Sequence, residues 1–187
     1  ALYEQGRYAE AVPLLREAFE KKGSRGGSLV EFHLRQSLTH EGRRLLVAGE
    51  SRAAVPYFAE AAVRWPTYPD LHFWHGMAQA RCERWDDALA SAQQALRYNG
   101  DYVEARLLEA CSLARLDAHA AAAESLDALV ASGQRVDHPL VRYLATHGLE
   151  DGGLPEDLFR YLDETVHRDA SGAEVQKAVS LCRTGAW

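Results

Sequence analysis

The chain has 187 residues, of which 47% are hydrophobic and 26% charged, and its formal net charge is −6. These values are close to those of ordinary soluble domains and speak against a disordered chain. The acidic balance, without a dense block of lysine and arginine, speaks against nucleic-acid binding, and no apolar run is long enough to predict direct insertion into a membrane.

Alanine is the outlier of the composition, with 31 residues against only 6 prolines. Alanine loses no side-chain entropy in a helix and lets neighbouring helices approach closely, so this bias favours packed helices over sheets. Three cysteines, Cys82, Cys111 and Cys182, are far apart and odd in number, which fits neither a disulfide framework nor a zinc site. Reduced thiols of a cytoplasmic protein are the expected state. Because a helical pattern has already begun at Ala1, we expect a piece of a longer polypeptide.

The first elements in chain order contain an internal repeat. Residues 6–18 (GRYAEAVPLLREA) and 49–61 (GESRAAVPYFAEA) share six of thirteen positions at a shift of 43. A shift of 34 then carries Gly42 onto Gly76 and Ala110, so the longer spacing holds nine extra residues, which the loop at 23–28 can accommodate. Pro13 and Pro56 each fall within a predicted second helix, where the missing amide should delay the helix start or bend it.

The later elements give signals for helix ends. Ser28 with Glu31 is a capping box that opens the first helix of the second repeat, and Asp101 with Glu104 plays a similar part in the fourth. Gly100 is expected to be the left-handed residue that ends a helix. The sequence therefore predicts helical hairpins joined by short turns.

A helix–turn–helix unit of 34 residues is typical of tetratricopeptide repeats, and the chain resembles that family. The matching residues fall into three classes. Small residues stand at the middle of the first helices and alanines early in the second helices, where a mostly large apolar residue and then another alanine follow. Aromatic residues or proline stand near the turns. The matching residues are Gly42, Gly76 and Ala110; Ala11, Ala54, Ala88 and Ala122; Leu15, Phe58 and Leu126; Ala18, Ala61 and Ala95; and Tyr8, Trp85 and Pro66. The resemblance implies an all-α fold, a right-handed superhelix of stacked antiparallel helix pairs, with repeats at about 1–23 (partial), 29–66, 67–100 and 101–134.

Beyond Ser132 the period fades, and we expect capping helices over 135–187. Asp137-His-Pro139, Leu154-Pro-Glu156 and Ser171-Gly-Ala-Glu174 indicate helix starts, and Leu158, Leu162 and Val166 form one apolar stripe. Three helices would close the end of the stack; a degenerate fifth repeat followed by one capping helix is the alternative.

The family resemblance also implies a concave groove lined by the first helix of each pair. Carried onto this sequence, the groove candidates are Gln36, Thr39, Arg43 and Leu46; Asp70, Phe73, Met77 and Arg81; and Glu104, Leu107, Cys111 and Arg115. Arg81 and Arg115 occupy equivalent positions, with Arg43 nearby, and this set favours a partner that bears carboxylates. Alternatively, the three arginines lie near helix C-termini only because cations oppose the helix dipole there.

Some members of the family hold the acidic tails of chaperones with a clamp of lysine and asparagine. Thr39 and Arg43 stand where such polar residues would be expected, and the lysine and asparagine themselves are missing. The resemblance therefore does not favour binding of chaperone tails.

Enzymatic constellations are weak in this sequence. His72 and His75 could share a helix face as metal ligands, with Cys82 further along, but no HExxH or paired CxxC motif supports them. Partly buried histidines with local hydrogen bonds are the favoured interpretation. The glycine-rich loop at 23–28 lacks the lysine of a phosphate-binding loop. We therefore predict no catalytic activity, no cofactor and no metal.

The function that these features favour is a scaffold for protein–protein interaction, which binds a partner protein or peptide in the groove, either alone or as a subunit of a larger assembly. Two alternatives remain open. The repeats could be a regulatory or substrate-recruiting domain of a longer enzyme, or a chaperone of the same repeat family for secretion or pilus subunits.

Overall fold

A computed structural model of the chain describes residues 2, 5–22, 28–131, 160 and 162–163. Seven α-helices and no strands lie in these ranges, which confirms the all-α prediction for this part of the chain. The helices are α1 (Tyr8–Lys22), α2 (Ser28–Val47), α3 (Ser51–Arg64), α4 (Pro69–Ala80), α5 (Trp85–Tyr98), α6 (Val103–Arg115) and α7 (His119–Ala131).

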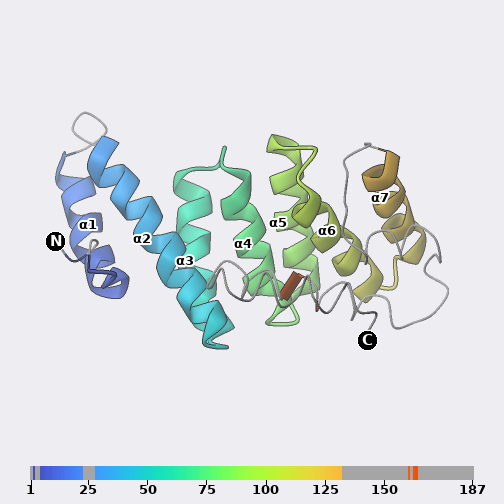
Figure 1. The fold of residues 1–187 in the computed structure, drawn as a ribbon, viewed down its shortest axis with the longest axis horizontal. Coiled ribbons are helices and arrows are strands. Elements are labelled where there is room, and N and C mark those ends of the chain that lie inside the picture. Colours follow the sequence, from blue (N-terminus) through green and yellow to red (C-terminus); the bar gives the residue numbers. More distant parts are fainter. Residues whose placement is uncertain (1, 3–4, 23–27, 132–159, 161, 164–187) are drawn as a thin grey trace, which may run out of the picture.

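The helices stand side by side in chain order and form a stack of antiparallel hairpins (Figure 1). Each helix packs against its neighbours in sequence. In addition, α4 contacts both α2 and α6, whereas the second helices of successive pairs approach one another less closely. Since elements on the inner side of a curved stack lie closer together, α2, α4 and α6 form the inner face.

The turns between the two helices of each pair repeat at the level of single backbone atoms. Gly49, Glu83 and Asp117 are 34 residues apart, and each has a positive φ, of 77°, 60° and 58°. The amide of each donates to the carbonyl three residues earlier, and the next amide donates to the carbonyl five residues before itself. This is the Schellman pattern that ends a helix, so every first helix ends in the same way.

Small residues inside the first helices make room for side chains of neighbouring helices. A Cβ atom at Gly42 would lie 2.6, 2.8 and 2.9 Å from three ring atoms of Phe58, and one at Gly76 would lie 2.8 Å from a methyl carbon of Leu108. The Phe58 ring is fully buried and stacks on Trp74 with 6.3 Å between the ring centroids. The predicted small positions therefore set how closely successive helices approach.

The buried apolar side chains form two clusters along the stack. One lies at the N-terminal end, around Leu34, Leu38 and Leu71, and the other extends from Leu45 to Leu126 and also includes Leu162. Polar side chains join helices next to these clusters: the Trp65 indole N–H donates to Glu31 over 2.6 Å, and Arg16 of α1 pairs with Glu60 of α3. The core is thus a chain of local contacts rather than one centre.

Several predictions about helix ends were wrong. The residue before α6 is Tyr102, which makes no side-chain capping hydrogen bond, so Asp101 is not the cap. Gly100 does not have the left-handed backbone that was predicted, and the residue that directly follows α5 is Asn99, whose backbone is extended. Pro13 and Pro56 do not delay their helices, which begin five residues earlier at Tyr8 and Ser51; the alternative, a bend in each helix, stays a prediction. Both proline side chains are exposed.

The predicted C-terminal capping helices lie outside the described residues, apart from Arg160, Leu162 and Asp163. These three have helical backbone.

Candidate protein-binding surface

The candidate surface lies on the inner face formed by α2, α4 and α6. The structure places the twelve predicted residues on these three helices, except that Arg81 directly follows α4. From α2 come Gln36, Thr39, Arg43 and Leu46; from α4 and its end come Asp70, Phe73, Met77 and Arg81; and from α6 come Glu104, Leu107, Cys111 and Arg115.

The apolar members of the set lie in the core beneath this face. Leu46, Met77, Leu107 and Cys111 are fully buried and Phe73 almost so, and all belong to the larger cluster. In this state they are packing residues rather than exposed contacts. They give the face a rigid apolar base.

Two of the three predicted arginines lie over tryptophan rings. The guanidinium carbon of Arg43 is 4.8 Å from the centroid of Trp74, and that of Arg115 is 5.3 Å from the centroid of Trp85. Cation–π contact of this kind is favourable and holds the guanidinium against the ring face. Arg43 is partly exposed and Arg115 exposed, so both present positive charge at the surface.

Arg81 has a different environment from its repeat equivalent Arg115. Its Nη1 donates to the backbone carbonyl of Leu46, at the end of α2, and its Nε pairs with the carboxylate of Asp163. The Leu46 carbonyl belongs to the last turn of a helix, where a cation is favoured. Arg81 therefore both caps α2 and binds a carboxylate from outside the helical hairpins.

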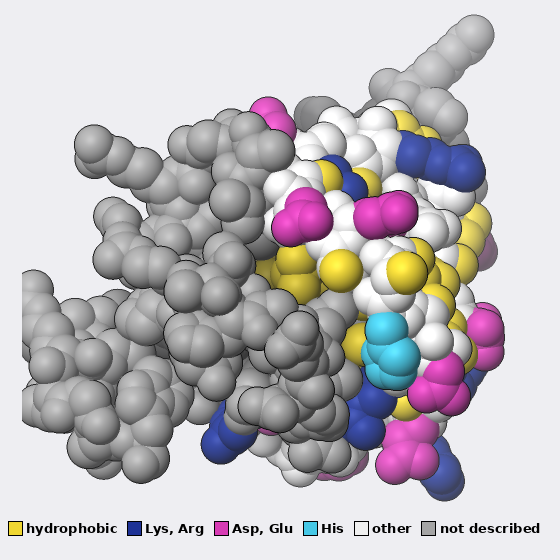
Figure 2. All heavy atoms as spheres, turned by 90° about the vertical axis from the view of Figure 1, so that its right-hand side faces the viewer, with side chains coloured by type: hydrophobic (Ala, Val, Ile, Leu, Met, Phe, Trp, Pro, Cys, Tyr) yellow, Lys and Arg dark blue, Asp and Glu magenta, His cyan; other side chains and the backbone are white. Residues whose placement is uncertain are grey.

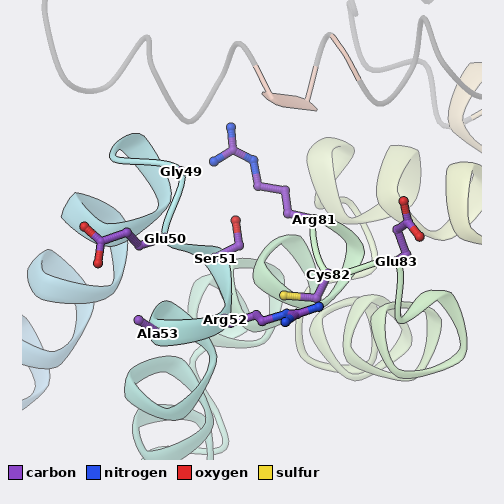
Figure 3. Close-up of a pocket in the computed structure, with 8 residues that line it drawn as sticks. All are labelled: Gly49, Glu50, Ser51, Arg52, Ala53, Arg81, Cys82 and Glu83. Carbon is purple, nitrogen blue, oxygen red and sulfur yellow. The ribbon is translucent and has the colours of Figure 1, made fainter.

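An open cleft of about 580 Å³ lies beside Arg81, where the turn after α2 faces the turn after α4. Figure 3 shows the Arg81 side chain leaving this cleft and pointing toward the ribbon at residues 162–163. The remaining lining residues are Gly49, Glu50, Ser51, Arg52, Ala53, Cys82 and Glu83. The two turns, which are equivalent in successive repeats, thus hold Arg81 at the edge of the inner face.

Leu162, next to Asp163, is fully buried and belongs to the same apolar cluster as Leu46, Met77 and Leu107. The two residues thus place an apolar and an acidic side chain on the inner face together. The sequence predicted Leu162 only as part of the apolar stripe of a capping helix, and nothing in its spacing relates Asp163 to Arg81, 82 residues earlier.

The remaining polar candidates are partly exposed. Gln36, Asp70 and Glu104 have accessible side chains, and the Thr39 hydroxyl donates to the carbonyl of Arg35 over 2.9 Å. Their burial agrees with a surface position. No pattern in the sequence indicated that the tryptophans under Arg43 and Arg115 support these arginines.

The two histidines make the local hydrogen bonds that were favoured. Nε2 of His72 lies 2.7 Å from the carbonyl of Pro66, and His75 lies within hydrogen-bond reach of Gln79 and Ser91. Burial lowers the pKa of His75 to about 4, with smaller contributions from His72 and Arg84. Within the described part of the chain, no group of three or more His, Cys, Asp or Glu residues is arranged to hold a metal ion.

The environment of Cys111 does not favour nucleophilic chemistry. Cys111 is fully buried, and this burial raises the pKa of its thiol to about 12, only partly opposed by Arg115. A thiol with such a pKa is protonated at neutral pH and is a poor nucleophile.

The end of the stack at α7 has a mixed surface. Figure 2 shows hydrophobic side chains in a band with acidic side chains beside it, over the coloured, described part of this face. No dense basic patch of the kind used to bind nucleic acid is visible there. Among the helices described, none combines the length and the apolar character needed to cross a bilayer.

Comparison with known proteins agrees with the geometry of the turns. Residues 75–136, about a third of the chain, match the family model described as tetratricopeptide repeat. No curated protein matches the chain. Upstream of the match, α2 and α3 show the same turn at Gly49 and the same kind of small position at Gly42. The match and the repeated hairpin geometry together show that residues 75–136 are similar to tetratricopeptide repeats, and they support assignment to that family.

Proposed function

We propose that the chain is a scaffold for protein–protein interaction, which binds a segment of a partner protein across the inner face of α2, α4 and α6. Tetratricopeptide repeats generally mediate protein–protein interaction, and folds of this kind typically serve as non-catalytic scaffolds. The position of the binding surface and the chemistry of the partner are the parts that we add.

The observation that carries the proposal is the pairing of Arg81 with a carboxylate from outside the helical hairpins. The Arg81 side chain is only 13% exposed and bonds the Leu46 carbonyl at the same time. A guanidinium held in this way is oriented in advance, which reduces the entropy lost when a carboxylate binds. Arg43 and Arg115, each over a tryptophan ring, extend the positive charge along the face.

The proposal is tested by affinity capture with the full chain and two charge-reversed variants. The surface variant is Arg81→Glu/Arg115→Glu. The matched control is Lys21→Glu/Arg97→Glu, which changes the net charge equally at two exposed basic residues of α1 and α5, away from the cleft beside Arg81. Proteins captured by the wild-type chain and by the control should be lost from the surface variant, by about tenfold or more for two removed charge-assisted contacts.

Both variants should keep the helical circular dichroism of the wild-type chain, so that a loss of binding is not a loss of fold. Equal capture by the surface variant and the wild-type chain would contradict the inner-face assignment. In that case the captured proteins must bind another face of the stack.

A further inference from the structure

We propose that Leu162 and Asp163 occupy the partner site in cis, and that a partner must displace them with the same pair, an aliphatic side chain followed directly by a carboxylate. This inference rests on the proposed function, because it names the ligand of the same inner face. It adds that the face is closed by the chain itself until a competitor arrives.

The first support is the quality of the contacts that the two residues make. Leu162 is 0% exposed within the larger apolar cluster, to which α2, α4 and α6 contribute Leu46, Met77 and Leu107, and the adjacent Asp163 pairs with Arg81. One residue thus uses the apolar base of the face and the next uses its charge. A leucine in the apolar cluster followed directly by an aspartate on Arg81 is the kind of paired contact by which a short peptide is recognised.

The second support is the construction of the receiving site. Arg81 is held by the Leu46 carbonyl, a partner within the hairpins that does not depend on Asp163. The tertiary site therefore persists when the occupant leaves. Its equivalent Arg115 lies over Trp85 and is exposed, so the repeat position alone does not create this site.

The third support is that the occupant can be displaced. The Asp163 side chain is 32% exposed, and a partly exposed ion pair contributes little net stability. The buried Leu162 side chain therefore supplies most of the affinity of the segment itself. Attachment to the same chain adds an effective concentration on the order of millimolar. A free ligand of the same chemistry must overcome this concentration, so the wild-type chain binds it weakly.

The test uses the full chain and a fluorescein-labelled peptide with the sequence of residues 158–165, LFRYLDET, in a polarisation assay. A peptide with asparagine in place of the aspartate at position 163 serves as the ligand control. The variant that opens the face is Leu162→Ala/Asp163→Ala. Its matched control is Leu14→Ala/Asp101→Ala, which removes an exposed leucine and an exposed aspartate elsewhere.

We expect the opened variant to bind the peptide about tenfold more tightly than the wild-type chain or the matched control. This factor is the ratio of the effective concentration of the tethered segment, on the order of 1 mM, to a dissociation constant of roughly 0.1 mM for the peptide. Addition of Arg81→Ala to the opened variant should abolish this gain, and the asparagine peptide should show little of it. Asp163→Arg is a second opening variant: it leaves Leu162 in place but sets a cation against Arg81, and it should give the same direction of change.

Equal peptide affinity for the opened variants and the wild-type chain would overturn the occlusion in cis. If Arg81→Ala still weakened that binding, the proposed function would stand without the occlusion. Failure of every variant to bind the peptide would overturn the ligand assignment, and capture by the wild-type chain but not by Arg81→Glu/Arg115→Glu would then show that the inner face binds a ligand of different chemistry.

Discussion

At the scale of single residues, the turn positions show how the sequence encodes the repeat and where it deviates from the best choice. Gly49 has a positive φ without steric cost, since glycine has no Cβ. Glu83 and Asp117 adopt the same conformation at equivalent positions, where an L-residue with a side chain is strained. The same turn conformation therefore costs less conformational energy at Gly49 than at Glu83 and Asp117.

This difference predicts opposite effects for two substitutions. Glu83→Gly should raise the free energy of unfolding by about 1 kcal/mol, because it removes the left-handed strain. Gly49→Ala should lower it by a similar amount, although no atom lies within 4 Å of the added Cβ. Chemical denaturation measures both. Glu83→Ala is the control and should change little; a stabilisation by alanine equal to that by glycine would show that the side chain, not the backbone, causes the effect.

His75 predicts a dependence of stability on pH. Its pKa is lowered to about 4 in the folded chain, chiefly by burial, whereas the unfolded chain takes up the proton near pH 6.5. Its contribution is therefore complete above about pH 6.5 and is lost as the pH falls toward 4. Between about pH 7 and pH 5 the wild-type chain should lose on the order of 1 to 2 kcal/mol more stability than His75→Gln. Parallel denaturation curves for the two proteins across this range would contradict the lowered pKa.

At the scale of helices, the fit between neighbours depends on where small residues meet large ones. Gly42 lies in α2 against the Phe58 ring of α3, and Gly76 lies in α4 against Leu108 of α6. Glycine within a helix costs about 1 kcal/mol relative to alanine, so close packing must outweigh that cost at these positions. The helix pairs are thus selected for mutual fit rather than for the intrinsic helix propensity of each helix.

Gly42→Ala tests this balance. The gain in helix propensity is about 1 kcal/mol, but overpacking of a buried ring costs about 1–3 kcal/mol, and stacking on Trp74 restricts movement of the Phe58 ring. The net effect should be destabilisation. Phe58→Leu in the same chain should reverse most of the overpacking, which a double-mutant cycle measures as a coupling of the two sites. Gly100→Ala, with a nearest atom at 3.9 Å, is the neutral control.

At the scale of the whole molecule, stability is distributed along the stack. The N-terminal cluster around Leu34 and Leu38 is separate from the larger cluster that includes Leu107 and Leu108. Helices contact mainly their neighbours in sequence. A stack of this kind behaves as a row of coupled units rather than as one cooperative body.

This arrangement predicts that a core mutation acts regionally. Leu38→Ala removes a fully buried side chain and should cost about 2–5 kcal/mol in its own cluster. Native-state hydrogen exchange should show reduced protection of amides in α1–α3 and a much smaller change in α5 and α6. Leu108→Ala should give the reverse pattern. Equal loss of protection along all helices would mean that the stack unfolds as a single unit.

Much of the fold could be predicted from the sequence, because the recurrence of small and apolar residues is a local property. The equivalence of Gly42 and Gly76 could be read directly from their spacing, and the helix–turn–helix unit followed. Details of helix ends were less predictable. Tyr102 rather than Asp101 precedes α6, since capping depends on how the preceding turn enters the helix, and several residues near it have the right chemistry.

The candidate surface divides in the same way. The sequence by itself determined that Arg81 and Arg115 occupy equivalent positions, because equivalence follows from the repeat. Only the tertiary structure decided that Arg81 bonds the end of α2 and receives Asp163, while Arg115 lies over Trp85. The physical reason is that the repeat pattern encodes the helices of each pair, but not the segments from elsewhere in the chain that pack against them. A contact between residues 82 positions apart depends on how the chain returns to the stack, and no local pattern records that path.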